Sequence, residues 1–128
     1  MKVTLREPGG YLWFEVYERA SAEDFRDFYA HVVAHSERTG ITRILIDSHE
    51  AIAPSVSWIY EAARTLPREP ARRFAGLYRD RAVFQSVANF TETATENRGF
   101  VVKTFFDPDD AVRWLLGTGS QHDAPPPA

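Results

Sequence analysis

Four chemically capable side chains follow one short apolar run of the sequence. Ile44-Leu45-Ile46 is followed at once by Asp47, Ser48, His49 and Glu50. A carboxylate, a hydroxyl and an imidazole this close together have the composition of an acid–base pair or of a polar pocket wall. The alternative is a solvated loop in which Asp47 and Ser48 accept hydrogen bonds from backbone amides. We treat these four residues as a candidate interaction or ligand site.

Two serines lie where a helix is expected to begin. Ser55 and Ser57 open an apolar segment with helical spacing. A helix N-terminus presents free backbone amides and a partial positive charge, which suit a phosphate group or a phosphoserine. Simple capping of the helix by Ser55 is the alternative. Both serines join the candidate site.

The sequence predicts no metal site, no cofactor and no catalytic residue. His31 and His35 have the i, i+4 spacing of a helical metal chelate, but no third ligand accompanies them. The chain has no cysteine, which excludes thiolate ligands and disulfides. It also contains no glycine-rich phosphate loop and no nucleophile-elbow motif.

Two further groups of residues suggest surfaces. Tyr11, Trp13 and Tyr17 form an aromatic row on one face of an expected strand, and such a row either binds a ligand or, more often, packs under a helix. Arginines near Pro67 and Pro70 form a local basic patch or, as the favoured interpretation, part of a solvated turn. These arginines are Arg64, Arg68, Arg72 and Arg73.

A framework of alternating strands and helices must position these side chains. Periodicity of two and short apolar runs predict strands over residues 3–6, 11–17, 44–46, 74–78 and 100–106. Helical spacing, caps and glycine stops predict helices between residues 21 and 40, 55 and 66, 80 and 99, and 107 and 117. A polar loop is expected from Asp47 to Ala53. The inward stripe of the third helix is expected to comprise Val83, Val87, Phe90 and Ala94.

This order predicts an α/β fold. Two strands that form a hairpin are followed by alternating helices and strands, which implies one mixed, mainly parallel sheet of about five strands with about four helices. Residues 1–117 are expected to form a single domain. Residues 118–128 have no apolar periodicity and include Pro125-Pro126-Pro127, so a disordered tail is expected there.

Composition limits the function classes. The chain has 128 residues and a net charge of -3, which argues against nucleic acid as a partner because such affinity rests on neutralised phosphates. The first residues are charged and contain no long apolar run, so neither a signal peptide nor a transmembrane segment is expected. A cytoplasmic location is the default expectation.

Two stretches resemble a known family. Residues 41–63 read ITRILIDSHEAIAPSVSWIYEAA, and residues 90–115 read FTETATENRGFVVKTFFDPDDAVRWL. With the opening strands, this order of elements resembles the STAS domain, the anti-sigma-factor-antagonist-like (SpoIIAA-like) module, and most closely its single-domain bacterial relatives. Regulatory members carry a serine at the start of the second helix that a partner kinase phosphorylates. Matching the strand ends places Ser57 at that position, so the resemblance implies Ser57 as a candidate phosphorylation site.

Three function hypotheses follow from these patterns. The first is a non-enzymatic, STAS-like regulatory or protein-interaction domain that acts through residues 47–57, with an unidentified protein partner and the option of a homodimer. The second is a small-ligand or lipid-binding domain with a cavity between sheet and helices, a role that relatives of the resembled family also fill. The third is a hydrolytic enzyme built on Asp47, Ser48 and His49.

Overall fold

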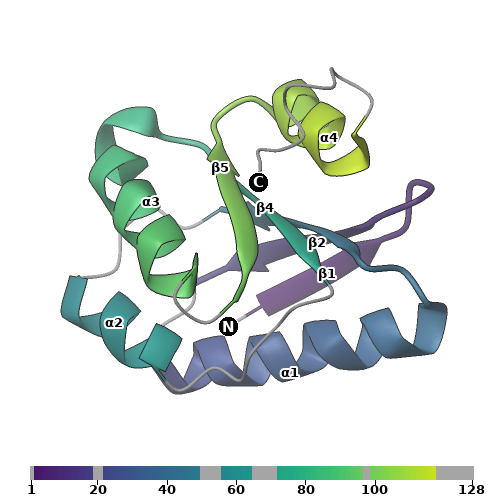
Figure 1. Ribbon diagram of the computed structural model, residues 1–128, viewed down its shortest axis with the longest axis horizontal. Helices are drawn as coiled ribbons and strands as arrows, with labels where there is room; N and C mark the ends of the chain where they lie inside the picture. Colours follow the sequence, from purple (N-terminus) through teal and green to yellow (C-terminus); the bar gives the residue numbers. More distant parts are fainter. Residues whose placement is uncertain (1, 19–21, 50–55, 65–71, 97–98, 118–128) are drawn as a thin grey trace.

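The chain alternates strands and helices in the predicted order (Figure 1). The structure is a computed structural model, and residues 2–18, 22–49, 56–64, 72–96 and 99–117 of it are described here. The strands are β1 (Lys2–Arg6), β2 (Leu12–Tyr17), β3 (Arg43–Ser48), β4 (Arg73–Tyr78) and β5 (Val101–Phe105). The helices are α1 (Ala22–Thr39), α2 (Val56–Arg64), α3 (Arg81–Glu96) and α4 (Pro108–Leu116).

The five strands form one mixed sheet in sequential order, β1-β2-β3-β4-β5. The strand β1 pairs with β2 antiparallel and forms one edge, as the predicted hairpin requires. The pairs β2–β3, β3–β4 and β4–β5 are all parallel. Because parallel strands run the same way, the carboxyl ends of β2, β3 and β4 meet at one edge of the sheet. The predicted α/β class and the mainly parallel sheet are therefore confirmed.

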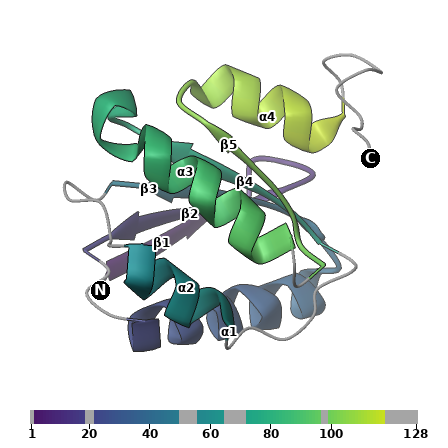
Figure 2. The same cartoon turned by 60° about the vertical axis from the view of Figure 1, so that its left-hand side comes forward.

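The helices cover the two faces of the sheet unequally. Figures 1 and 2 show α1, α2 and α3 on one side of the sheet and α4 alone on the other. On the first side, Phe28 and Val32 of α1 pack against the inward side chains of β2, and Phe74 and Phe100 extend the same apolar cluster. The second side is covered by α4 over β3, β4 and β5. On the α4 side of the sheet, no described helix therefore covers the outer parts of β1 and β2.

Helix ends follow the predicted chemistry. Gly40 adopts a left-handed φ of 75° and donates its N–H to the Ser36 carbonyl at 2.8 Å, which ends α1. The Asp107 side chain accepts the Asp110 N–H at the start of α4, and Gly117 closes that helix with a φ of 70°. Side-chain capping thus fixes where α4 begins, and a residue tolerant of positive φ fixes where it ends.

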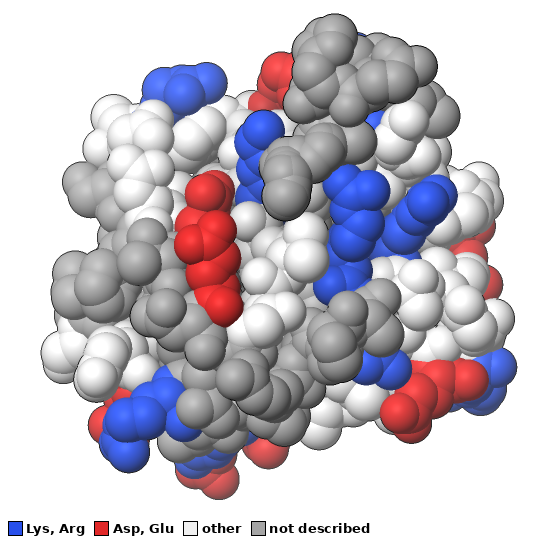
Figure 3. Space-filling model, in the orientation of Figure 1, with Lys and Arg blue, Asp and Glu red and all other residues white. Residues whose placement is uncertain are grey.

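Two arginines hold the C-terminal end of α4. Arg73 donates to the Trp114 carbonyl at 3.1 Å, and Arg43 donates to the Leu116 carbonyl at 3.5 Å. Cations at this end complement the negative end of the helix dipole, and Figure 3 shows basic side chains gathered below α4. Burial, together with nearby Arg43, lowers the pKa of the Arg73 guanidinium from its ordinary value.

Two local predictions are corrected. Asp47 and Ser48 were expected to begin a loop, but they form the last two residues of β3. Val83 was expected to point inward from α3, but 41% of its surface is exposed, and Phe84 and Ala88 are buried instead. The side chains of Val87, Phe90 and Ala94, the other expected members of this stripe, lie outside the described ones.

Candidate functional site

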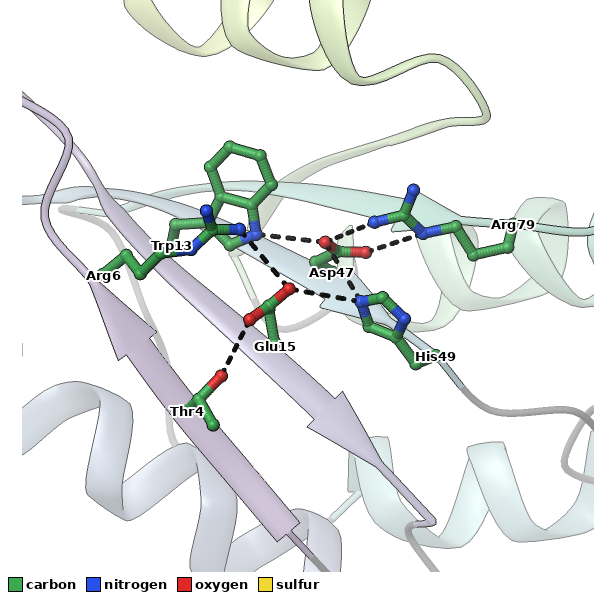
Figure 4. A network of polar contacts seen from close by, with 7 residues as sticks. All are labelled: Thr4, Arg6, Trp13, Glu15, Asp47, His49 and Arg79. Carbon is green, nitrogen blue, oxygen red and sulfur yellow. Dashed lines mark hydrogen bonds and ion pairs between the residues drawn. The ribbon is translucent and has the colours of Figure 1, made fainter.

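A polar cluster lies at the carboxyl ends of β2 and β3, on the α4 side of the sheet (Figure 4). Glu15 of β2 and Asp47 of β3 are partners in the parallel register, so their side chains lie side by side on the same face. His49 follows β3, and its backbone N–H donates to the Val16 carbonyl at 2.9 Å. This bond continues the strand geometry for one residue, which turns His49 to the same face as Asp47.

Asp47 is a fully buried carboxylate whose charge is compensated. Arg79 donates to Oδ1 through Nε at 3.1 Å and to Oδ2 through Nη2 at 2.6 Å. Trp13 Nε1 also donates to Oδ2, at 3.1 Å. A paired charge with several donors can be buried, whereas an isolated one is costly. The Asp47 carboxylate thus connects β3 to Trp13 of β2 and to Arg79, which directly follows β4.

Glu15 and His49 are the half-buried members of the cluster. His49 Nε2 lies 3.5 Å from Glu15 Oε2 and 3.3 Å from Asp47 Oδ2. Thr4 donates to Glu15 Oε1 at 2.9 Å, and Arg6 Nη2 lies 3.4 Å from Oε2. One ligand atom from each of Glu15, Asp47 and His49 lies within 4.8 Å of the other two. The cluster therefore combines two carboxylates and one imidazole, which are groups that can exchange protons or bind a metal ion.

The structure brings together only part of the predicted site. Asp47 and His49 share a face, whereas the alternation along β3 sends Ser48, 2% exposed, to the opposite side of the sheet. Ser57 is exposed on α2. Glu50 and Ser55 lie outside the described residues.

Sequence reasoning missed Glu15 as a member of the site. The residue lies on the polar face of β2, and only the pairing of β2 with β3 places it beside Asp47. Arg79, which follows β4 at the same edge of the sheet, was not identified as the partner of Asp47 either. The available signal was the charge pattern, since a buried strand ending in aspartate requires a cation from a neighbouring strand end.

The histidine pair on α1 lies on the opposite side of the sheet from this cluster, where both rings contact Phe14. The rings of His31 and His35 are 4.5 Å apart between centroids, and Arg38 donates to His35 Nδ1. Burial lowers the pKa of His35; the nearby charges of Arg38 and His31 lower it further, and Glu7 offsets part of the effect. Among the described residues, three side chains that could together hold a metal ion are found at Glu15, Asp47 and His49.

The aromatic row and the arginines mostly contact other described side chains of the domain. Tyr11 is buried and stacks on Trp13 with centroids 6.3 Å apart. Burial raises the pKa of the Tyr11 hydroxyl, and Arg6 offsets part of that rise. Arg72 donates to Ser36 Oγ at 2.8 Å. Arg64 lies 3.8 Å from Glu61, and Arg68 lies outside the described residues.

Comparisons with known proteins do not assign the chain to a family. No family model, curated protein or solved structure matches the chain. Among the described helices, none has the length and apolar character needed to cross a membrane. The likeness to STAS domains therefore remains a resemblance of sequence pattern.

Proposed function

We propose that the chain is a non-enzymatic, STAS-like regulatory or protein-interaction domain. Its contact surface would comprise the exposed face of α2 and the part of the predicted segment 47–57 that opens this helix at Ser57, because Asp47 and Ser48 are buried. One observation carries this proposal: Tyr60 leaves 60% of its surface exposed, and Ser57, one helical turn earlier, is exposed as well. Side chains at i and i+3 lie on the same face of a helix. Tyrosine is enriched among the residues that dominate binding energy at protein interfaces. An exposed tyrosine next to Ser57 is therefore a good candidate for a contact with a protein partner.

The hydrolytic alternative is poorly supported by the geometry. A nucleophilic serine must lie within hydrogen-bond reach of its base. Ser48 and His49 are neighbours along an extended chain, so their side chains point to opposite faces of the sheet. Asp47, the third residue of that hypothesis, has no exposed surface and binds Arg79 with both oxygens.

The ligand-binding alternative requires space between sheet and helices. Phe14, Phe28 and Val32 at this interface are at most 2% exposed and belong to one apolar cluster. The rings of Phe14 and Phe28 are in edge contact, with centroids 5.7 Å apart. This contact fills the space between β2 and α1 with side chains at that point, which favours the interaction hypothesis over a cavity there.

Ser57→Asp should change the capture of a protein partner while leaving thermal stability nearly unchanged. The new carboxylate lies in the first turn of α2, where the helix dipole favours it, and one turn before Glu61, which opposes it; both effects are a few tenths of a kcal/mol to about 1 kcal/mol. The measurement is affinity capture with mass spectrometry, beside a melting curve. Ala34→Asp, which adds the same charge on the exposed surface of α1, is the matched control.

Two further arms separate the hypotheses. Ser55→Ala should lower stability by about 1 kcal/mol without a specific effect on capture if Ser55 caps α2. A melting-curve screen of metabolites and lipids tests the ligand alternative. If neither wild type nor Ser57→Asp retains a partner, and one small molecule raises the melting temperature in a dose-dependent way, the interaction proposal is wrong.

A further inference from the structure

The cluster of Glu15, Asp47 and His49 has the dimensions of a small metal site. Zinc bonds to nitrogen and oxygen of about 2.0–2.2 Å, arranged tetrahedrally, place neighbouring ligand atoms about 3.4 Å apart. His49 Nε2 lies 3.3 Å from Asp47 Oδ2 and 3.5 Å from Glu15 Oε2, which match two edges of such a tetrahedron. All three ligand atoms lie within 4.8 Å of one another. One ion could therefore contact all three after small side-chain rotations.

A second observation comes from His49 itself. Its Nε2 atom is buried and has no hydrogen-bond partner among the described residues, because the two nearby carboxylate oxygens are close without being aligned for a hydrogen bond. Leaving a buried polar atom unsatisfied costs about 1–3 kcal/mol. Such atoms in folded proteins call for an explanation, and a bound ion or water is among the usual ones.

The net charge of the cluster becomes negative, and so favourable for a cation, when Arg6 moves away from Glu15. Glu15 and Asp47 are opposed by Arg6 and Arg79. The contact of Arg6 with Glu15 is long, at 3.4 Å, and 55% of the Arg6 side chain is exposed. Arg6 also lies 4.3 Å from the centroid of the Trp13 ring, where a cation is stabilised without a carboxylate. Without Arg6, the two carboxylates and Arg79 carry one net negative charge.

The surrounding side chains orient the three ligands. Thr4 donates to the other oxygen of Glu15, and Arg79 Nε donates to the other oxygen of Asp47. The Asp47 ligand atom Oδ2 itself accepts from Arg79 Nη2 at 2.6 Å and from Trp13 Nε1 at 3.1 Å, and these donors must shift when an ion binds. The ring of Tyr17 stacks on His49 with centroids 4.7 Å apart. Outer contacts of this kind fix ligand orientation in metal sites, and carboxylate ligands are usually hydrogen-bonded to a second group.

We propose that Glu15, Asp47 and His49 bind one divalent transition-metal ion of the zinc class. Three protein ligands leave a fourth position for a water molecule, and the side chains of Glu15 and His49 are 21% and 26% exposed. An imidazole nitrogen with two carboxylates favours zinc-class ions over magnesium or calcium, which prefer oxygen alone. The proposal is independent of the interaction surface on α2.

The test is isothermal titration calorimetry of the full chain with Zn²⁺ alone. Wild type should bind one ion per chain, and Glu15→Gln and His49→Ala should each weaken binding by at least about tenfold, as loss of a ligand or of its support does. Arg6→Gln should bind the ion at least as tightly as wild type, because it removes a competing cation. Circular dichroism of each variant checks folding, and Glu15→Gln keeps the shape of the native side chain.

The double variant His31→Ala/His35→Ala is the matched control, since that histidine pair is a second imidazole source for zinc. It should bind like wild type. The proposal is overturned if wild type shows no saturable binding, if the α1 double variant abolishes binding, or if folded Glu15→Gln and His49→Ala bind as wild type does. Substitution of Co²⁺ for Zn²⁺ gives an absorption spectrum that reports nitrogen and oxygen ligation and should disappear in His49→Ala.

Discussion

Arg79→Ala should lower the free energy of unfolding by about 3 kcal/mol, because it leaves a buried carboxylate without its main counter-charge. Asp47 has no exposed surface, and Arg79 supplies two of its hydrogen bonds. Surface ion pairs are worth about 1 kcal/mol or less, and the 46% exposure of the Arg79 side chain alone would suggest that class. The buried partner decides the size of the effect. Urea denaturation of wild type and variant measures it.

A double-mutant cycle of wild type, Arg79→Ala, Asp47→Asn and the double variant isolates the cause. Asp47→Asn in the Arg79→Ala background removes the orphaned charge and keeps an oxygen that Trp13 Nε1 can reach. The double variant should therefore regain part of the lost stability, by more than about 0.5 kcal/mol, the usual limit of additivity between unconnected sites. Equal stability of Arg79→Ala and wild type would show that the ion pair contributes nothing to folding.

Trp114→Ala should cost about 3–5 kcal/mol of stability, as removal of a buried large aromatic side chain does. The Trp114 ring is 5% exposed and belongs to the apolar cluster that attaches α4 to β3 and β4. Arg73 lies over the ring, 4.2 Å from its centroid, and Phe105 packs at 5.7 Å. Chemical denaturation of wild type and variant measures the loss.

The neighbouring residue offers a control for the Trp114 experiment. Arg113 is on the same helix, its side chain is 54% exposed, and its ion pair with Asp110 is local. Arg113→Ala should change stability by less than about 0.5 kcal/mol. If Trp114→Ala is as mild as Arg113→Ala in chemical denaturation, α4 is only loosely attached to the sheet.

Local patterns in the sequence were sufficient for most of the fold. The short apolar run Ile44-Leu45-Ile46 predicted a strand, and β3 is the central strand of the sheet. The same pattern underestimated its length, because a buried aspartate at the strand end is stable only with donors from Trp13 and Arg79. Those donors are 34 and 32 residues away in sequence, beyond the reach of a local pattern.

The candidate site was less predictable than the fold. Asp47 and His49 were recognised because they are close in sequence to an expected strand end. Glu15 was not, because its position beside Asp47 depends on the register between β2 and β3. Ser48 was grouped with its neighbours by proximity, although alternation along β3 separates it from them. Side-chain direction, which requires the true strand boundary, decided which residues share a face.

The interaction proposal can be tested most directly at Tyr60. The measurement is the Kd, by isothermal titration calorimetry, between the captured partner in purified form and either wild type or Tyr60→Ala. Loss of an aromatic anchor from the middle of an interface costs about 2 kcal/mol, so the Kd should rise at least about tenfold. The melting temperature should stay nearly unchanged, because most of the ring is already exposed.

Val101→Ala serves as the control for this measurement, because Val101 is also an exposed apolar residue, 47% exposed, but lies on β5. It should bind the partner like wild type. A rise in Kd for Tyr60→Ala alone, at constant stability, is the predicted result. An unchanged Kd for Tyr60→Ala, or an equal rise for both variants, would contradict a contact surface on α2.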